Sequence, residues 1–221
     1  MDGALSSEGH ASGREFFARA RARLTLEVPP ALTDQTVAGV RGDLDLDPSL
    51  WERAGVAATR PAAVLVGVVD HPEPTVLLTL RNADLEAHAG QIAFPGGKIE
   101  PSDASPAAAA LREAQEEIGL APSLVDPIGH LDLYLTFSGY RILPTVARID
   151  PNHRLTLNRS EVDEAFEVPL AFLMDAQNHA LRSRDWKGII RRYYAMPFGE
   201  RCIWGVTAGI LRNLYERIYL A

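Results

Sequence analysis

The chain has 221 residues, of which 47% are hydrophobic and 23% charged, and its formal net charge is −7. This balance is typical of one soluble globular domain with appendages, and it argues against a general nucleic-acid-binding or anionic-membrane-binding surface. The single cysteine, Cys202, excludes an internal disulfide and a cysteine-based zinc cluster, and it fits a reducing compartment. We therefore expect a cytoplasmic protein whose partners include neither nucleic acid nor membrane.

The N-terminal quarter carries no functional signal. Residues 1–12 have no basic start and no apolar run, so we expect a disordered tail and no signal peptide. Residues 13–59 are predicted to form a helical and irregular extension that begins with a peripheral helix over residues 13–24. The main domain is expected over residues 60–221.

Apolar runs at residues 62–69 and 75–80 flank the turn sequence DHPEP and predict two strands of a hairpin. The first run is the longest apolar stretch of the chain and is far too short to span a bilayer. Further predicted elements are strands over 127–135, 140–149 and 189–196, a short helix over 169–177 and a closing helix over 202–220. Strands and helices interleave without regular alternation, which indicates a mixed sheet between helices.

Residues 105–118 give the strongest helix signal. Ser105 suits the N-cap, Pro106 the first turn, and Gly119 the position after the last turn. The sequence therefore predicts both ends of this helix as well as its existence.

Three carboxylates, Glu113, Glu116 and Glu117, share one face of this helix because they stand at i, i+3 and i+4. Exposed like charges at this spacing repel by about 0.2–0.5 kcal/mol per pair. A solvated acidic face is the commoner reason for such a triplet, and the triplet alone favours it. The alternative is a cation site, since hard carboxylate oxygens suit Mg²⁺ or Mn²⁺.

The segment FPGGKIEPSD before the helix favours the cation site, because a glycine pair permits close approach of backbone to a ligand or metal. Loop and helix together resemble the Nudix box, G-x5-E-x7-R-E-U-x-E-E-x-G-U with U apolar. Two features depart from it. Asp103 stands at the first glutamate position, and eight residues rather than seven separate it from Arg112. The half of the box that carries the glutamates is intact.

Residues 77–97 resemble an additional signature, L-L-T-x-R-[S/A]-x3-R-x3-G-x3-F-P-G-G, of the coenzyme A pyrophosphatase branch of that family. Asn82 and Glu86 depart from it, where the pattern has a small residue and an arginine. The resemblance covers roughly residues 60–215. It implies a Nudix-type α/β/α sandwich with a mixed central β-sheet. It also implies Mg²⁺- or Mn²⁺-dependent hydrolysis of coenzyme A or acyl-coenzyme A to 3′,5′-ADP and (acyl-)4′-phosphopantetheine.

The resemblance also implies roles for residues of the box. Glu113 and Glu117 are the first metal ligands, Glu116 stands close behind them, and the Gly96 carbonyl is a further candidate. Glu113, Glu116 and Arg112 are the implied catalytic residues, and Arg112 acts by orienting the glutamates through ion pairs.

Other roles stay open. The general base is a box glutamate or an acid from a later segment, with Glu161 and Glu164 as candidates; either is equally well a solvated acid before a turn. Arg81, His88 and Gln91 are candidates for contacting the nucleotide, although each is also an ordinary residue on a strand or loop.

Two alternatives remain beside the leading hypothesis. Glu86 replaces a cation with an anion and motivates another nucleotide substrate, such as ADP-ribose, a dinucleotide or a nucleoside triphosphate. A nucleotide-sensing Nudix domain without hydrolysis is the other, and the intact glutamate set argues against it. The partner is in each case a nucleotide-containing small molecule, and the sequence leaves a homodimer open.

Overall fold

A computed structural model of the chain describes residues 13–36, 41–42, 45–47, 59–85, 88–186 and 188–220. The predicted tail over residues 1–12 and the departure at Glu86 lie outside the described residues. No helix in the described part of the chain is long and apolar enough to cross a bilayer.

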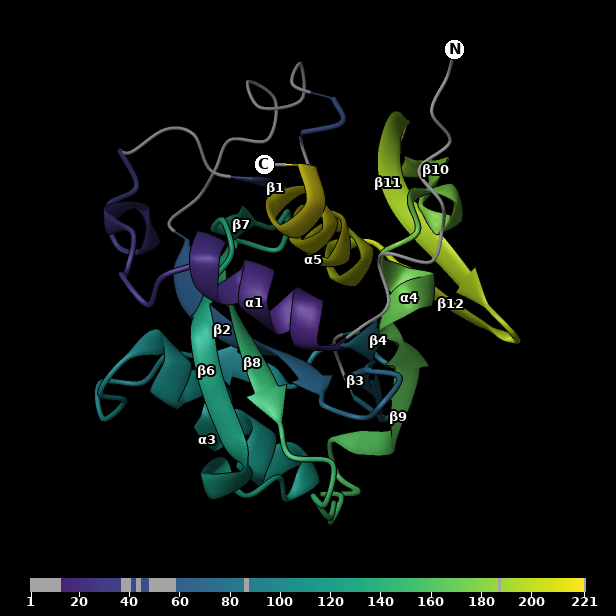
Figure 1. Ribbon diagram of the computed structural model, residues 1–221. Coiled ribbons are helices and arrows are strands. Elements are labelled where there is room, and N and C mark those ends of the chain that lie inside the picture. The colour runs from purple at the N-terminus through teal and green to yellow at the C-terminus, as the bar shows by residue number, and fades with distance from the viewer. Residues whose placement is uncertain are drawn as a thin grey trace.

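The described residues form two sheets (Figure 1). The larger sheet contains β1 (Arg41–Gly42), β2 (Arg60–Val69), β3 (Thr75–Arg81), β4 (Ile92–Ala93), β5 (Gly96–Lys98), β6 (Val125–His130), β7 (Tyr134–Leu135), β8 (Tyr140–Ile149) and β9 (Val162–Pro169). The smaller sheet contains β10 (Ala180–Trp186), β11 (Ile189–Phe198) and β12 (Arg201–Trp204). The helices are α1 (Gly13–Arg23), α3 (Pro106–Ile118), α4 (Leu170–Leu173) and α5 (Val206–Tyr215), which continues into a π-helical turn, η6 (Glu216–Leu220).

The larger sheet is mixed because its central strand β2 has partners of both orientations. It pairs in parallel with β8 along its whole length, and antiparallel with β3 at Val68 and Val69. The predicted hairpin over residues 62–80 is thereby confirmed. The first half of β2, at Ala62–Val64, pairs antiparallel with β5. This pairing fixes the loop that leads into α3.

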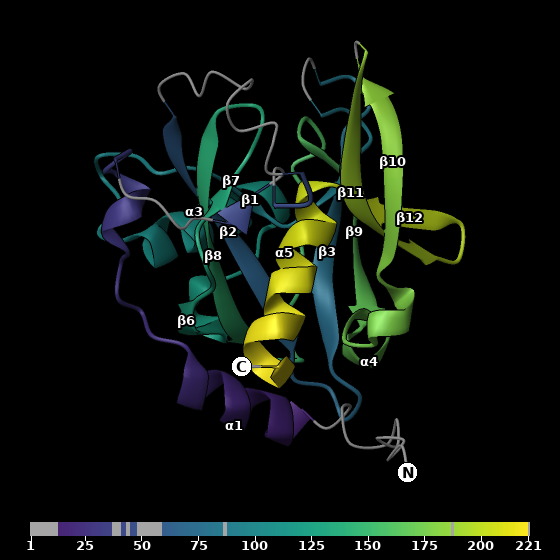
Figure 2. The ribbon, with the colours of Figure 1, turned by 90° about the horizontal axis from the view of Figure 1, so that it is seen from above.

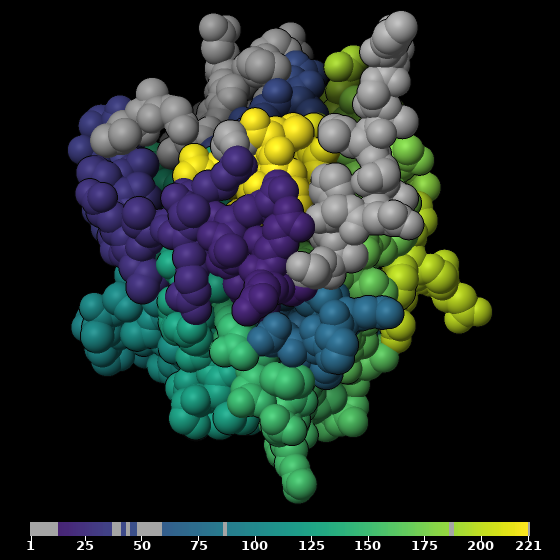
Figure 3. Space-filling model, viewed as in Figure 1, coloured from purple at the N-terminus to yellow at the C-terminus, as the bar shows by residue number. Residues whose placement is uncertain are grey.

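Helices cover both faces of the larger sheet, as the sandwich expectation requires (Figure 1). Alternate residues of β2 point to opposite faces. Leu65 packs in one core cluster with α3, whereas Val66 packs in the other with α1 and α5. Figure 3 shows α1 beside the C-terminal helical segment, and Arg23 Nη1 donates a hydrogen bond to the Ile218 carbonyl at 2.8 Å.

The N-terminal helix predicted over residues 13–24 is confirmed, but it is not peripheral. Phe16 and Ala20 are fully buried and belong to the same core as the central strands. The Thr25 carbonyl also accepts a hydrogen bond from the His130 amide at 2.8 Å. The helix buries its apolar stripe against the sheet because that stripe carries two adjacent phenylalanines.

The closing element differs from the single helix predicted over residues 202–220. Its first residues form β12. The helix α5 begins only at Val206, because Gly205 before it has φ 64°, which is not a right-handed helical conformation. The predicted helix over 169–177 is shorter and consists of α4 followed by a 3-10 turn at Ala176–Asn178. The strands β1, β4, β5, β9 and β10 have no counterpart in the prediction, and the single strand predicted over 127–135 is divided into β6 and β7.

Arg141 ties the N-terminal extension to β8. Its side chain is almost fully buried, and Nε donates to Thr59 Oγ1 at 2.8 Å. The guanidinium also donates to the carbonyls of Ala31 and Gln35. No carboxylate lies within ion-pair distance of it among the described residues. Backbone and hydroxyl oxygens therefore compensate this buried charge.

Replacing Arg141 by methionine is expected to lower the free energy of unfolding by about 3 kcal/mol, because the buried Ala31 carbonyl and Thr59 hydroxyl lose their donor. Urea denaturation measures the change. Arg182→Met on β10 is the matched control: this arginine is exposed, and its removal should change stability by less than about 0.5 kcal/mol. Equal losses in the two variants would contradict the anchoring role of Arg141.

Candidate active site

Helix α3 begins and ends as the sequence predicts. The Ser105 side chain accepts a hydrogen bond from the Ala108 amide at 3.1 Å, and Pro106 is the first helical residue. Gly119 adopts φ 68°, and its amide caps the last turn by donating to two helix carbonyls. These local signals fix the two ends of the helix, and the burial of Ala110, Ala114 and Ile118 in the core fixes which face carries the carboxylates.

The glycine pair before α3 is required by close contacts. A Cβ on Gly97 would lie 2.5 Å from the Glu113 carboxyl carbon, and one on Gly96 would collide with the Ala63 carbonyl oxygen. Gly96 also has φ 154°, which an L-residue rarely adopts. The Glu113 carboxylate thus rests directly against bare backbone, and any side chain at position 97 would displace it.

Glu117 is the most buried carboxylate of the site, with 3% of its surface exposed. Its Oε2 accepts a hydrogen bond from the Gly96 amide at 3.1 Å, and Arg81 Nη1 lies 3.6 Å from Oε1. Burial raises the pKa of Glu117 to about 7; the Gly96 amide and Arg81 oppose the rise, and the negative charges of Glu113 and Glu161 add to it. The Gly96 amide and Arg81 therefore do not fully compensate the negative charge of the Glu117 carboxylate.

Glu113 is a second carboxylate of the site whose negative charge is incompletely compensated. It is half-buried, and burial raises its pKa although Arg112 Nη1 donates to its Oε1 at 3.0 Å. The charges of Glu116 and Glu161 raise the pKa further. Two neighbouring carboxylates with raised pKa values are typical of a site that expects a cation.

Arg112 holds three acidic side chains of the box, those of Asp103, Glu113 and Glu116, in place. Its Nε and Nη2 donate to the two oxygens of Asp103 at 2.9 and 3.1 Å, and Nη2 also donates to the Lys98 carbonyl at 3.1 Å. Its Nη1 reaches Glu113 and, at 2.9 Å, Glu116.

Asp103 is thereby given a role that the sequence left in doubt. Its hydrogen bonds with Arg112 hold the pKa of its carboxyl below the usual value. The shorter acid and the extra residue before Arg112 still bring the two groups into a paired contact. Glu116 points toward solvent, since its side chain is 56% exposed.

The two acids proposed as general base lie in different surroundings. Glu164 pairs with Leu80 across the sheet, and both its carboxylate oxygens bind Arg201 Nη2, at 2.5 and 2.7 Å. Leu80 packs on the core that contains α5, so Glu164 faces away from α3. Glu161, held by Asn158 at 2.9 Å, instead adds its charge to the α3 carboxylates.

The three residues proposed to contact the nucleotide separate in the structure. Arg81 lies beside Glu117, and its Nε is buried without a hydrogen-bond partner in the described part of the chain. His88 and Gln91 lie in the loop between β3 and β4, and their side chains bond each other at 3.0 Å. The structure thus brings Arg81 to the carboxylates, whereas His88 and Gln91 do not contact them.

The donor set fits a hard divalent cation by its chemistry. The carboxylates at 113, 117 and 161 repel one another, two of them have raised pKa values, and the Gly97 backbone lies directly against Glu113. Among the described residues, no three acidic, histidine or cysteine side chains converge closely enough to enclose an ion. Glu113 and Glu116 are turned toward Arg112, and Glu117 toward Gly96 and Arg81.

A family model for the NUDIX domain matches residues 58–188, more than half of the chain. The chain belongs to the Nudix family.

The Nudix hydrolase NudL of Escherichia coli K12, described as uncharacterized, is 41% identical over 159 residues, covering 72% of this chain and 83% of its own. NudL of Cronobacter sakazakii is 43% identical over the same shares. As a Nudix hydrolase, the protein is a pyrophosphohydrolase that acts on nucleotide-containing small molecules, and this family generally uses divalent metal ions.

Solved structures are similar at a lower level. The Nudix hydrolase of Alicyclobacillus acidocaldarius has a TM-score of 0.46 and 21% identity, over 73% of this chain and 93% of its own. The Ap4A hydrolase of Caenorhabditis elegans, in a binary complex, has a TM-score of 0.43 and 19% identity, over 52% and 82%.

Proposed function

We propose that this Nudix hydrolase cleaves the pyrophosphate bond of coenzyme A or acyl-coenzyme A, with Mg²⁺ or Mn²⁺ as cofactor. One observation carries the proposal. Arg81 belongs to the upstream signature and Glu117 to the Nudix box, and their side chains lie 3.6 Å apart. This contact supports a single site to which both motifs contribute.

The α3 carboxylates have defined roles in this proposal. Glu113 and Glu117 would hold the metal, with Glu116 and the Gly96 carbonyl as further candidates. A divalent ion held there would supply charge neutralisation for the diphosphate and would lower the pKa of an attacking water. Glu161 is the better candidate for the general base, because its charge already acts on the α3 carboxylates, whereas Glu164 is committed to Arg201.

Arginines position the reacting groups. Arg112 holds Glu113 through Nη1 while its other nitrogens are fixed by Asp103. The Arg81 side chain is 27% exposed and lies beside Glu117, so its guanidinium is placed to bind a diphosphate oxygen there. His88 and Gln91 remain candidates for contacts with the nucleotide from the adjoining loop.

Incubation of the purified protein with coenzyme A and Mg²⁺ or Mn²⁺ tests the proposal. We expect 3′,5′-ADP and 4′-phosphopantetheine in equal amounts, detected by mass spectrometry. Glu86→Arg should raise kcat/KM for coenzyme A, by about tenfold if one charge-assisted hydrogen bond to phosphate is gained. Rapid cleavage of another nucleotide diphosphate without turnover of coenzyme A or its thioesters would overturn the proposal.

Glu86 favours a second candidate, the same chemistry on a different nucleotide such as ADP-ribose, a dinucleotide or a nucleoside triphosphate. An anion where the resembled signature has a cation disfavours an additional phosphate at that position. The second candidate predicts that Glu86→Arg leaves coenzyme A turnover unchanged. Comparing the four substrate classes at equal concentration separates the two candidates.

A further inference from the structure

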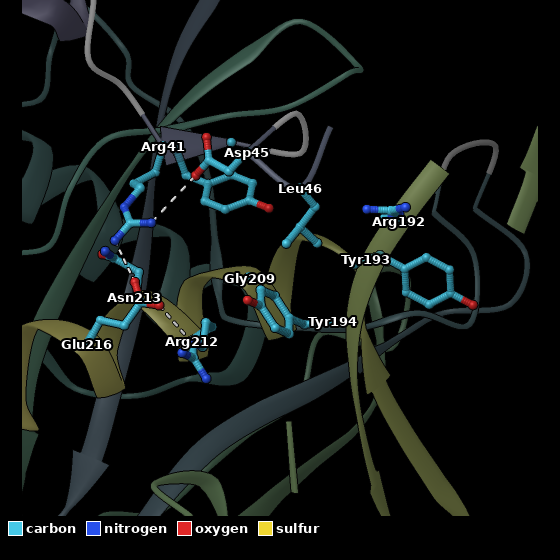
Figure 4. Close-up of a pocket in the computed structure, with 13 residues that line it drawn as sticks. Arg41, Asp45, Leu46, Arg192, Tyr193, Tyr194, Gly209, Arg212, Asn213 and Glu216 are labelled. Carbon is cyan, nitrogen blue, oxygen red and sulfur yellow. Dashed lines mark hydrogen bonds and ion pairs between the residues drawn. The ribbon is translucent and has the colours of Figure 1, made fainter. Parts of the chain in front are cut away.

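A cavity of about 200 Å³ lies between α5, β11 and β1, on the face of the larger sheet opposite α3 (Figures 2 and 4). Arginines and tyrosines dominate its wall. Ligand pockets for whole small molecules usually measure about 300–1,000 Å³, so this one suits a single end of a larger ligand. The charged and aromatic side chains that line the cavity indicate which end of the ligand it binds.

Two of the three arginines of the wall are already neutralised. Arg41 binds Glu216 and lies 3.8 Å from Asp45, and Arg212 Nε donates to Glu216 at 2.7 Å. Figure 4 shows the two arginines sharing this glutamate. The positive charges of Arg41 and Arg212 are therefore largely balanced by Glu216 and Asp45, and these two arginines are not the main anion-binding groups of the cavity.

Arg192 is the third arginine, and it has no acidic partner among the described residues. Figure 4 shows its guanidinium on the cavity side of β11, while the ring of the next residue, Tyr193, points away. An arginine fork of this kind matches the oxygens of a phosphate monoester, to which it donates two parallel hydrogen bonds.

An aromatic wall stands beside Arg192. Tyr194 lies under the Arg212 guanidinium, whose carbon is 5.5 Å from the ring centroid. Tyr134 is buried against Gly209, where a Cβ would collide with the tyrosine hydroxyl oxygen. Helix and rings are therefore closely packed, and the wall is rigid enough to orient a ligand.

The cavity lies at the end of the larger sheet where the carboxylates lie. β5 pairs with the first half of β2, and Arg60 at the start of β2 donates its amide to the Gly139 carbonyl at 2.9 Å. The Arg191 guanidinium of β11 lies 3.8 Å from the ring centroid of Phe137 in that same loop. The tip of β11 and the loop before β8 thus flank the end of the sheet that carries the Nudix box.

Helix α5 connects the cavity to the box as well. Thr207, between the cavity residues Gly205 and Gly209, donates its hydroxyl to the Ile92 carbonyl at 2.9 Å. Ile92 belongs to β4, four residues before Gly96. The cavity wall and the glycine loop are therefore joined through one strand.

We propose that this cavity receives the 3′-phosphate end of the substrate's nucleoside and that Arg192 contacts that phosphate. The assignment rests on the proposed function, because coenzyme A carries such a monoester in addition to its diphosphate. Arg192 acts in binding and specificity, and the α3 carboxylates act on the diphosphate.

Coenzyme A and dephospho-coenzyme A differ only in the 3′-phosphate, and the comparison of the two tests the assignment. For Arg192→Gln, kcat/KM for coenzyme A should fall about tenfold to a hundredfold, through KM, because a charge-assisted contact is lost. Hydrolysis of dephospho-coenzyme A should be unchanged, which also shows that the variant is folded. Arg182→Gln, an exposed arginine on the neighbouring strand, should alter neither substrate.

Equal losses on both substrates, or no loss on either, would overturn the assignment. Free adenosine 3′-monophosphate should compete with coenzyme A in the wild type and not in Arg192→Gln. Stimulation of dephospho-coenzyme A hydrolysis by this monophosphate would instead indicate a separate effector site and overturn the assignment. If the wild type cleaves neither substrate, the proposed function fails, and the assignment fails with it.

Discussion

Replacing Glu117 by glutamine is expected to lower kcat/KM by about a thousandfold, because the substitution removes one negative charge from the proposed metal site while keeping the side chain's shape. The amide oxygen of the introduced glutamine would still accept the hydrogen bond from the Gly96 amide that fixes the native carboxylate. The loss should therefore come from chemistry and metal binding rather than from unfolding. Steady-state kinetics with Mg²⁺ measures it.

The same variant should change how stability depends on pH. The folded-state pKa of Glu117, about 7, lies above its unfolded value near 4.5, so the folded protein binds the proton more tightly. The cost of ionising this buried group is absent below about pH 4.5, grows between pH 4.5 and 7, and is fully present above pH 7. It amounts to about 3 kcal/mol in the metal-free protein.

Thermal unfolding without metal should therefore show the wild type losing stability as the pH rises from about 5 to about 8, with Mg²⁺ restoring part of it. Glu117→Gln should reduce both effects, with the part that comes from Glu113 remaining, and Glu200→Gln, at an exposed acid in the turn after β11, should change neither. An unchanged pH slope in Glu117→Gln would show that another group carries the dependence.

Replacing Arg112 by lysine is expected to lower kcat about tenfold to a hundredfold with a smaller change in KM. Lysine carries one compact charge on one nitrogen. It cannot donate to Asp103 through two nitrogens while a third nitrogen donates to Glu113 and Glu116, as the guanidinium does. Glu113 would then lose its orientation against Gly97, although its own chemistry is intact.

A double-mutant cycle with Asp103→Asn separates this effect from a general loss of stability. Asp103 contacts Arg112 and the Glu100 amide but none of the α3 glutamates, so its removal should act through Arg112. We expect strongly non-additive effects on kcat, since both substitutions disrupt one network. Additive effects would contradict the positioning role of Arg112.

The elements of the fold that the sequence predicts best are those whose capping and turn residues lie within the element itself. Helix α3 has its N-cap, its first-turn proline and its C-terminal glycine within the chain segment itself, and the β2–β3 hairpin has its turn sequence. Because the predicted helix boundaries are correct, the shared face of Glu113, Glu116 and Glu117 follows from spacing alone. The resemblance to the Nudix family then supplies the fold class, which the structure confirms.

The parts that the sequence does not predict depend on contacts distant along the chain. The register between β9 and β3 is irregular, because Glu164 pairs with Leu80 while Val162 pairs with Arg81, and Glu161 lies before the strand. A register shift of one residue moves a side chain to the other face of the sheet, and the local sequence pattern does not predict such a shift. The burial of α1 and the anchoring of residues 31–36 by Arg141 likewise require partners about a hundred residues away.

The direct test of the central claim, that the crowded carboxylates of α3 form a divalent-cation site, is a titration with Mn²⁺ followed by electron paramagnetic resonance. Wild-type protein should bind Mn²⁺ and reduce the signal of the free ion, and Mg²⁺ should compete. Glu117→Gln should weaken binding about tenfold or more, and Glu200→Gln should not weaken it. Identical Mn²⁺ binding by wild type and Glu117→Gln would contradict the claim.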